Sequence, residues 1–362
     1  MKRKVTPLVV PVFLPHAGCP HQCVFCDQHT VTGRSSPIAD PAVVSRAMEI
    51  YAGNRSSGAR PVQIAFYGGN FLGLPVRVVR AFLDAAARFV AAGRADSIRF
   101  STRPDTVDDV RLGVLSDYPV STVEIGAQSM SDRVLRQSRR GHGAADTIHA
   151  VELLKKNGFE VGVQMMVGLP GDTEKTALAS GRDIAALAPA FVRIYPTLVL
   201  AGSPLGRQYS QGRYRPLDLE GAVQVTKRLW VIFYNRRIPV IRMGLQASAE
   251  LEDGSSVMAG PYHPAFGHLV YEALFLDAVC SRFSDQPPDG TACLVVHPRN
   301  MSKLRGLNNR NMKRLTDQFH LRHLAVETDA SLSCNTVVVN GHPCRLYGNR
   351  PDAATDAGAP CG

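Results

Sequence analysis

Three closely spaced cysteines constrain this chain more than any other feature. Cys19, Cys23 and Cys26 follow an apolar, strand-like segment with the spacing C-x3-C-x2-C. Cysteine thiolates are the usual protein ligands of a cubane cluster, which holds four irons. Three thiolates would leave one iron open to a small-molecule ligand, just as a catalytic zinc keeps one open position. The spacing favours such a cluster over two alternatives, namely three free buried thiols or a structural zinc site that lacks one ligand.

The composition is that of a globular protein of a reducing compartment. The 362 residues are enough for one barrel-sized domain and a smaller one, and hydrophobic and charged residues make up 45% and 20% of them. No apolar stretch reaches the roughly eighteen residues of a membrane span, and the basic N-terminus leads into a strand rather than a cleavage site. Eight cysteines, three of them clustered, do not suggest a disulfide framework. We therefore predict a cytoplasmic protein that contacts no membrane.

Beyond the cysteines, apolar strand-like runs alternate with helical segments, which is the pattern of parallel β/α units. The predicted strands cover residues 7–14, 62–67, 97–102, 121–127, 159–167, 191–197 and 238–243. The helices between them include residues 40–52, 75–92, 131–139, 144–157 and 219–235. This order predicts an α/β fold in which the strands form a closed or partial (β/α) barrel, with its chemistry collected where the strands end.

The last third of the chain predicts a small α+β appendage. Its predicted elements are a helix over residues 265–282, a strand over 292–297, a helix from Asn300 to Phe319, and short strands near 323–328 and 335–339. We place the barrel domain at residues 1–243 and the appendage at 244–348. Residues 349–362 are rich in Ala, Asp, Gly and Pro, which predicts a disordered tail.

The net charge is concentrated in the appendage. Lysine and arginine exceed aspartate and glutamate by ten, 41 against 31. Between His297 and His323 seven basic residues stand against one acid, Asp317; they are Arg299, Lys303, Arg305, Arg310, Lys313, Arg314 and Arg322. On a single helix they fall largely on the outer faces. Two explanations remain open, a solvated helix surface and a phosphate-binding face for nucleic acid.

Residues 19–28 resemble the cluster loop of the radical S-adenosylmethionine (SAM) superfamily. In that family three cysteines hold a 4Fe–4S cluster, and its open iron chelates the amino and carboxylate groups of SAM. The resemblance implies that Cys19, Cys23 and Cys26 are the metal ligands and that the fold is a partial (β/α)6 barrel. An aromatic residue commonly precedes the third cysteine and lies beside the adenine, and here that residue is Phe25.

Further matches lie at the ends of later strands. Residues 67–71 read Tyr-Gly-Gly-Asn-Phe and resemble the family's Gly-Gly-Glu or related motif, which implies that Gly68 and Gly69 bind the SAM amino group through their backbone; an asparagine replaces the acid. Gln128 and Arg140, twelve residues apart, match residues that hydrogen-bond the ribose and carboxylate of SAM. Gln164 also matches a SAM-contacting position, whereas an acid that is usual on the third strand is replaced by serine at position 101.

Two of the longer matches point to one subgroup. The sequences Arg-Arg-Gly-His at 139–142 and Arg-Ile-Tyr-Pro-Thr-Leu at 193–198 resemble the Elongator subunit 3-like proteins. Coproporphyrinogen dehydrogenases share the residues that match Gln128 and Arg140. Members of that subgroup carry an acetyltransferase domain after the barrel. No Arg/Gln-x-x-Gly-x-Gly/Ala loop that could cradle a CoA pyrophosphate follows here. We therefore expect no acetyl transfer.

The resemblance implies a radical SAM enzyme that reductively cleaves SAM to a 5′-deoxyadenosyl radical, with an electron donor such as flavodoxin or ferredoxin. The subgroup and the basic segment together favour tRNA as partner and a tRNA nucleoside as substrate. Two alternatives are a radical SAM enzyme acting on a small metabolite, such as a tetrapyrrole-like or peptide substrate, and a non-enzymatic cluster or nucleic-acid-binding protein. The sequence singles out no residue that acts on the substrate.

Overall fold

A computed structural model describes residues 7–20, 23–27, 40–52, 60–245, 251 and 256–346. By their internal contacts the residues form two compact units. Unit 1 comprises the chain up to 225 together with 232–264, and unit 2 comprises 226–231 together with the chain from 265. The predicted tail at 349–362 lies outside the described residues. None of the described helices has the length and the apolar character needed to cross a membrane.

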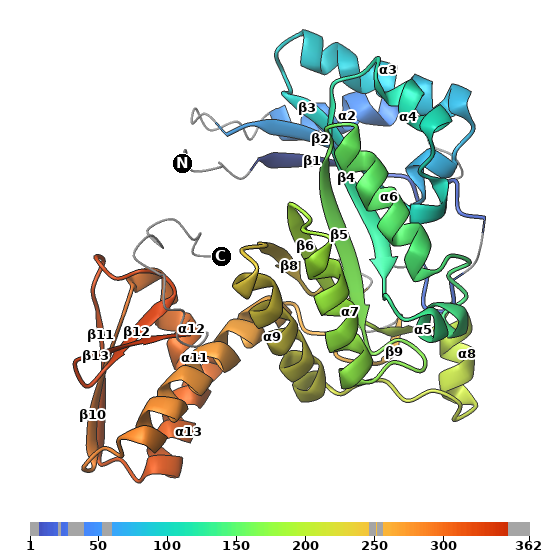
Figure 1. Cartoon of the computed structure of the whole chain (residues 1–362). Coiled ribbons are helices and arrows are strands. Elements are labelled where there is room, and N and C mark those ends of the chain that lie inside the picture. Colours follow the sequence, from blue (N-terminus) through green and yellow to red (C-terminus); the bar gives the residue numbers. More distant parts are fainter. Residues whose placement is uncertain are drawn as a thin grey trace. The chain divides into compact units, whose positions relative to one another are not determined.

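Unit 1 is built on a parallel sheet whose seven strands follow one another in chain order, β1-β2-β3-β4-β5-β6-β8 (Figure 1). The strands are β1 (Leu8–Phe13), β2 (Val62–Tyr67), β3 (Ser97–Thr102), β4 (Val120–Gln128), β5 (Glu160–Val167), β6 (Phe191–Pro196) and β8 (Val240–Met243). Each predicted strand is present, within two residues at either end. The predicted α/β partial barrel with a small α+β appendage is thus confirmed.

Helices connect these strands in the manner of parallel β/α units. They are α2 (Ala42–Ala52), α3 (Val76–Ala91), α4 (Asp109–Leu115), α5 (Asp132–Gln137), α6 (Ala144–Lys156), α7 (Glu174–Ala186), α8 (Pro204–Ser210) and α9 (Leu219–Asn235), with short 3-10 turns η1 (Phe71–Gly73) and η2 (Pro104–Thr106). Figure 1 shows α6 and α7 alongside the green strands β4 and β5. Residues 244–264, which the sequence assigned to the appendage, contribute β9 (Val257–Ala259), and β9 pairs with β7 (Val199–Leu200) in unit 1.

The two faces of the large sheet differ in chemistry. On strands β2 to β6 most alternate residues are apolar and buried, for example Ile98, Val123, Ile125, Val163 and Val192. Successive strand side chains point to opposite faces, so the residues between them form the other face. That second face is polar and carries glutamine, arginine, glutamate and tyrosine side chains. One face therefore provides the hydrophobic core, and the other is available for chemistry.

Unit 2 is a small α+β unit, as predicted. Its helices are α11 (Phe266–Asp285), α12 (Met301–Arg305) and α13 (Arg310–Phe319), with 3-10 turns η3 (Pro298–Asn300) and η4 (Leu307–Asn309). Its sheet has the order β11-β10-β12-β13, formed by β10 (Thr291–Val296), β11 (His323–Thr328), β12 (Thr336–Val339) and β13 (His342–Arg345).

The prediction of one helix from Asn300 to Phe319 is wrong. The chain breaks between α12 and α13 because Gly306, Asn308 and Asn309 adopt positive φ angles of 74°, 54° and 59°. Glycine adopts such angles without strain, and asparagine tolerates them better than most residues. The basic residues of this segment consequently sit on two helices and the turns between them.

Candidate functional site

The cysteine loop follows β1, and it brings its three thiols into one electrostatic neighbourhood. Cys23 is buried, and Cys19 and Cys26 are half-buried. Burial raises the pKa of Cys26, and the thiols of Cys23 and Cys19 raise it further. Burial and Cys23 likewise raise the pKa of Cys19, whereas Arg103 and Arg140 act in the opposite direction. The two guanidinium groups therefore favour thiolates, the form that binds iron.

This donor set fits an iron–sulfur cluster better than a single metal ion. Within the described part of the chain, no three His, Cys, Asp or Glu side chains are grouped to hold one ion. A cubane makes a different demand, because each thiolate binds its own iron and the sulfurs need not converge on one point. Three free thiols in one loop beside two buried arginines meet that demand.

The glycine pair after β2 packs directly on the cysteine loop. A Cβ atom on Gly69 would lie 2.2 Å from the carbonyl oxygen of Ala17, and one on Gly18 would lie 2.2 Å from that of Asn70. The backbone N–H of Asn70 donates to the Ala17 carbonyl at 2.8 Å. Gly68 has a φ of 103°, a conformation that favours glycine. Side chains at these positions would push the two loops apart.

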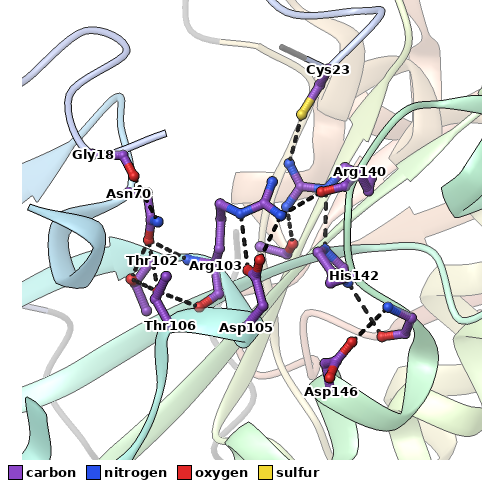
Figure 2. Close-up of polar contacts among 12 residues, drawn as sticks. Gly18, Cys23, Asn70, Thr102, Arg103, Asp105, Thr106, Arg140, His142 and Asp146 are labelled. Carbon is purple, nitrogen blue, oxygen red and sulfur yellow. Dashed lines mark hydrogen bonds and ion pairs between the residues drawn. The ribbon is translucent and has the colours of Figure 1, made fainter. Parts of the chain in front are cut away.

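Asn70 links the cysteine loop to the end of β3, as Figure 2 shows. Its side-chain amide donates to the Gly18 carbonyl at 2.9 Å. Its Oδ1 accepts from the Thr102 hydroxyl at 2.7 Å, the Thr106 hydroxyl at 2.9 Å and the Arg103 backbone N–H at 3.0 Å. An amide offers both a donor and acceptors, whereas an ionised carboxylate only accepts. This explains why an asparagine can take the place of an acid here.

Arg140 stands between the cysteine loop and β4 (Figure 2). Its Nη1 donates to Cys23 Sγ at 3.2 Å, its Nη2 to the Gly126 carbonyl at 2.6 Å, and its Nε to His142 Nε2 at 3.2 Å. Only 6% of its surface is exposed. Three of its five N–H groups are thus engaged, and two remain for a ligand.

His142 holds Arg140 as a neutral hydrogen-bond acceptor. Burial and the neighbouring Arg140 charge lower the pKa of His142 to about 4. The ring is therefore neutral at pH 7, and because its Nε2 accepts from Arg140, the proton lies on Nδ1, which faces the Gly143 carbonyl at 3.3 Å. Arg103 helps to hold Arg140 in place, because it donates a hydrogen bond to the Arg140 carbonyl. Arg103 is itself fixed by two hydrogen bonds, of 2.9 and 2.8 Å, to Asp105.

Gln128 ends β4 in a conformation that is unusual for its residue type. Its φ is 65°, in the left-handed region, where non-glycine residues tend to mark functional sites. Its Oε1 is buried and accepts no hydrogen bond among the described residues. A buried acceptor without a partner costs free energy unless a ligand donates to it. Gln128 and Arg140 meet at Gly126, where a Cβ atom would lie 3.0 and 3.5 Å from their side chains.

The remaining predicted residues lie on either side of this group. Phe25 is half-buried and packs on a small apolar cluster of Val24, Val199 and Leu205. Gln164, on β5, donates to the Ser101 hydroxyl at 3.0 Å and to Glu124 Oε2 at 2.8 Å. The sequence-predicted residues therefore gather at the ends of β1, β2 and β4, except for Gln164, which lies on the polar face of the sheet.

That polar face holds a charged network that the sequence analysis missed. Glu124 is fully buried. Its Oε1 accepts hydrogen bonds from Arg99 at 2.5 Å and from the Tyr67 hydroxyl at 2.9 Å, and it forms an ion pair with Arg193 at 3.1 Å. Burial and Glu124 raise the pKa of Tyr67, so its hydroxyl stays protonated. Although burial alone would lower the pKa of Arg193, Glu124 raises it overall. The sequence feature that could have indicated this network is the presence of polar residues at alternate positions of otherwise apolar strands.

Two family profiles match the chain. The Radical SAM superfamily matches residues 13–184, and the Radical SAM C-terminal domain matches residues 189–275. Among curated relatives, an uncharacterised protein of Methanocaldococcus jannaschii is 28% identical over 60% of this chain and 68% of its own length. The tRNA uridine(34) acetyltransferase of Methanocaldococcus infernus is 26% identical over 60% of this chain and 48% of its own. Elongator complex protein 3 of Mus musculus is 28% identical over 46% of this chain and 34% of its own length.

The chain spans about half the length of the tRNA uridine(34) acetyltransferases that it matches. Among solved structures, the archaeal Elp3 of Methanocaldococcus infernus superposes with a TM-score of 0.57 at 22% identity, over 74% of this chain and 62% of that one. This likeness shows a shared fold. The two profiles establish that the chain belongs to the radical SAM superfamily of enzymes, whose cofactors are a 4Fe–4S cluster and S-adenosylmethionine.

Proposed function

We propose that Cys19, Cys23 and Cys26 ligate the 4Fe–4S cluster and that the chain cleaves SAM reductively. The observation that carries this proposal is Arg140, which contacts the Cys23 thiol and the end of β4 at once. When bound, a reduced cluster supplies the electron that splits SAM into methionine and a 5′-deoxyadenosyl radical. An external carrier such as flavodoxin or ferredoxin delivers that electron. The chain itself orients SAM and excludes water.

Each SAM group has a candidate partner at this edge. The two unused N–H groups of Arg140 suit a carboxylate, because a guanidinium donates parallel hydrogen bonds. The unpartnered Oε1 of Gln128 suits a ribose hydroxyl as donor. The backbone of Gly68 and Gly69 would accept the SAM amino group, and Phe25 would lie beside the adenine. Gln164 would contact SAM from the polar face of the sheet.

Gln128→Ala and Arg140→Ala test this assignment. Each removes one proposed SAM contact, so SAM affinity should fall about tenfold, which is the value of one charge-assisted or otherwise buried hydrogen bond. Iron content should stay at the wild-type level in Gln128→Ala; Arg140 also contacts Cys23, so the SAM affinity of Arg140→Ala is measured on protein that has been matched for iron content. Gln318→Ala and Arg77→Ala serve as matched controls, because both side chains are exposed. With dithionite, the wild type should release 5′-deoxyadenosine; unchanged SAM affinity in both site variants would refute these contacts.

We further propose that the substrate is a nucleoside in tRNA. The support is the set of relatives named as tRNA uridine(34) acetyltransferases and Elongator complex protein 3, together with the basic segment of unit 2. That segment is not uniformly available for RNA. Lys303 is only 8% exposed and lies over the Tyr271 ring, and Arg310 pairs with the buried Glu272 at 2.6 Å. The exposed basic side chains that remain are Arg299, Arg305, Lys313, Arg314 and Arg322.

Replacing Arg299, Arg305, Lys313 and Arg314 together by glutamine tests the RNA proposal. Phosphate contacts release counterions, so the variant should bind tRNA more weakly and show a shallower dependence of affinity on salt. SAM cleavage without substrate should not change. Arg77→Gln and Arg88→Gln, on α3 of unit 1, form the control. If the wild type does not bind tRNA at low salt, a small-metabolite substrate, such as a tetrapyrrole-like or peptide one, replaces this proposal.

A further inference from the structure

Arginines form a row on the polar face of the large sheet. Arg193 on β6 and Arg242 on β8 are partners in the parallel register. Residues in register on neighbouring strands point to the same face, and such strands lie about 4.8 Å apart. Arg99, on β3, reaches the same face from the other side of Glu124. Like charges placed side by side on a sheet repel each other unless an anion lies between them.

The acids on this face do not balance the arginines. Its strands carry three arginines, Arg99, Arg193 and Arg242, and two acids. Glu124 already accepts hydrogen bonds from Arg99, the Tyr67 hydroxyl and Gln164, and it forms an ion pair with Arg193. Glu160 lies at the first residue of β5, where it accepts from the Thr122 hydroxyl at 3.1 Å. Among the described strand residues of this face, arginines therefore outnumber acids by one.

Donors in the row also lack acceptors. Arg193 Nε and Arg99 Nε are buried and make no hydrogen bond within the described chain. The Arg99 side chain is only 4% exposed and that of Arg193 14%. Arg242 is half-buried, and no hydrogen bond or ion pair joins it to another described residue. The other N–H groups of Arg99 and Arg193 do find acceptors, which include Gln63 for Arg99 and the Tyr67 and Tyr195 hydroxyls for Arg193. A buried N–H group without an acceptor is costly, and native structures seldom retain one without a reason.

We propose that Arg193 and Arg242 bind an oxyanion of the substrate, either a carboxylate or a phosphate. Arginine suits both groups, because its planar fork donates parallel hydrogen bonds to two oxygens. The pair lies on β6 and β8, whereas the residues proposed for the SAM carboxylate and ribose lie at and after the end of β4. This inference rests on the proposed function, since it assigns the β6 and β8 part of the polar face to the substrate of the radical reaction.

Isothermal titration of the reconstituted holoenzyme with inorganic phosphate, and separately with acetate, tests the site. Ionic strength is held constant with chloride. Wild-type protein should bind at least one of the two anions, and Arg242→Gln should weaken that binding about tenfold, as expected for one charge-assisted hydrogen bond. Arg77→Gln, an exposed arginine of α3, should bind as the wild type does. Preference for phosphate identifies a nucleotide-type group, and preference for acetate identifies a carboxylate.

Repeating the titration in saturating SAM separates the two sources of a carboxylate. If the anion belongs to the substrate, binding persists with SAM present. If SAM abolishes it, the arginine pair holds the SAM carboxylate and the substrate assignment is overturned. Absence of anion binding, or equal binding by Arg242→Gln, also overturns it. The readout does not involve SAM cleavage, so this inference and the proposed function can fail independently.

Discussion

Two buried glutamates, one in each unit, perform different tasks with the same side chain. Glu124 in unit 1 pairs with Arg99, which is buried, and with Arg193, which is largely buried; their side chains are 4% and 14% exposed. Glu272 in unit 2 accepts from the backbone N–H of Leu307 at 2.8 Å and from Arg310, whose side chain is 48% exposed. In unit 2, water could hydrate Arg310 if the glutamate were removed. In unit 1, Arg99 and Arg193 are too buried for water to replace the glutamate in this way.

This difference distinguishes Glu272, which stabilises the fold, from Glu124, which belongs to a charged face that we propose binds a ligand. Glu272 fixes the turn between α12 and α13, and its cation is otherwise free to turn towards solvent. Glu124 pairs with two of the three arginines on the polar face, where the strands carry more arginines than acids. Buried ion pairs seldom gain stability over apolar packing, but breaking one leaves an expensive charge. We expect the consequences of removing each carboxylate to differ accordingly.

The largest expected effect is that of Glu124→Gln. It leaves Arg99 and Arg193 buried without their shared anion, which should lower the free energy of unfolding by about 3–5 kcal/mol. Urea denaturation, with Glu152→Gln on the exposed side of α6 as control, measures it. A loss no greater than that of the control would contradict the view that this carboxylate neutralises the arginines. Added phosphate should recover part of the loss.

The second effect concerns His142 and depends on pH. Because its pKa in the folded protein is about 4, against 6.5 for an unperturbed histidine, the unfolded chain binds more protons between these values. Stability should therefore fall as the pH is lowered from 6.5 to 4, by up to about 3 kcal/mol from this residue. His142→Gln keeps an acceptor for Arg140 and does not titrate.

Cluster-free protein is the right sample for this comparison, since acid would also remove a cluster. The difference in unfolding free energy between wild type and His142→Gln should shift in favour of the variant as the pH falls through this range. A constant difference from pH 7 to 4 would mean that His142 titrates normally in the folded chain.

Asn70→Asp should cost about 1–3 kcal/mol, the penalty for leaving a buried carbonyl without its donor. The carboxylate can still accept from Thr102, Thr106 and the Arg103 N–H, but it cannot donate to Gly18. Protonation would restore a donor, so the defect should shrink in acid. Hydrogen exchange of the Asn70 amide, which donates to Ala17, reports the loop contact directly. Unchanged protection of that amide would show that the link is dispensable.

The smallest effect is expected for Glu272→Gln, at about 1–2 kcal/mol. The amide oxygen can still accept from Leu307, and half-exposed Arg310 can turn to water. Thermal unfolding of both glutamate variants side by side gives the comparison its sharpest form. Equal losses at positions 124 and 272 would remove the distinction drawn between the two units.

How well the sequence predicts each region follows from the range of the interactions involved. The seven strands of the large sheet are evident from local apolar runs, and the cysteine loop from spacing within eight residues. The helix break at Gly306 was missed because Leu304 and Leu315 are eleven residues apart, close to three helical turns, so the apolar stripe continues in phase across it. The positive φ angles of Asn308 and Asn309 are set by tertiary packing as much as by residue type.

The charged network around Glu124 could not be predicted from the sequence for a different reason. Glu124, Arg99 and Arg193 come from three strands and meet only when the sheet forms. Each residue alone is an ordinary polar position in an apolar strand. The same holds for Asn70, whose departure from the family pattern became intelligible once its four hydrogen-bond partners were in view.

The central claim is that the three clustered cysteines hold the cluster with which this chain cleaves SAM. Anaerobic reconstitution followed by iron analysis and electron paramagnetic resonance of the reduced protein tests it most directly. Wild-type protein should hold about four irons per chain, the content of a cubane cluster. Replacing Cys19, Cys23 and Cys26 together by alanine should abolish the iron and the signal, whereas Cys280→Ala should change neither. A full cluster in the triple variant would contradict the account.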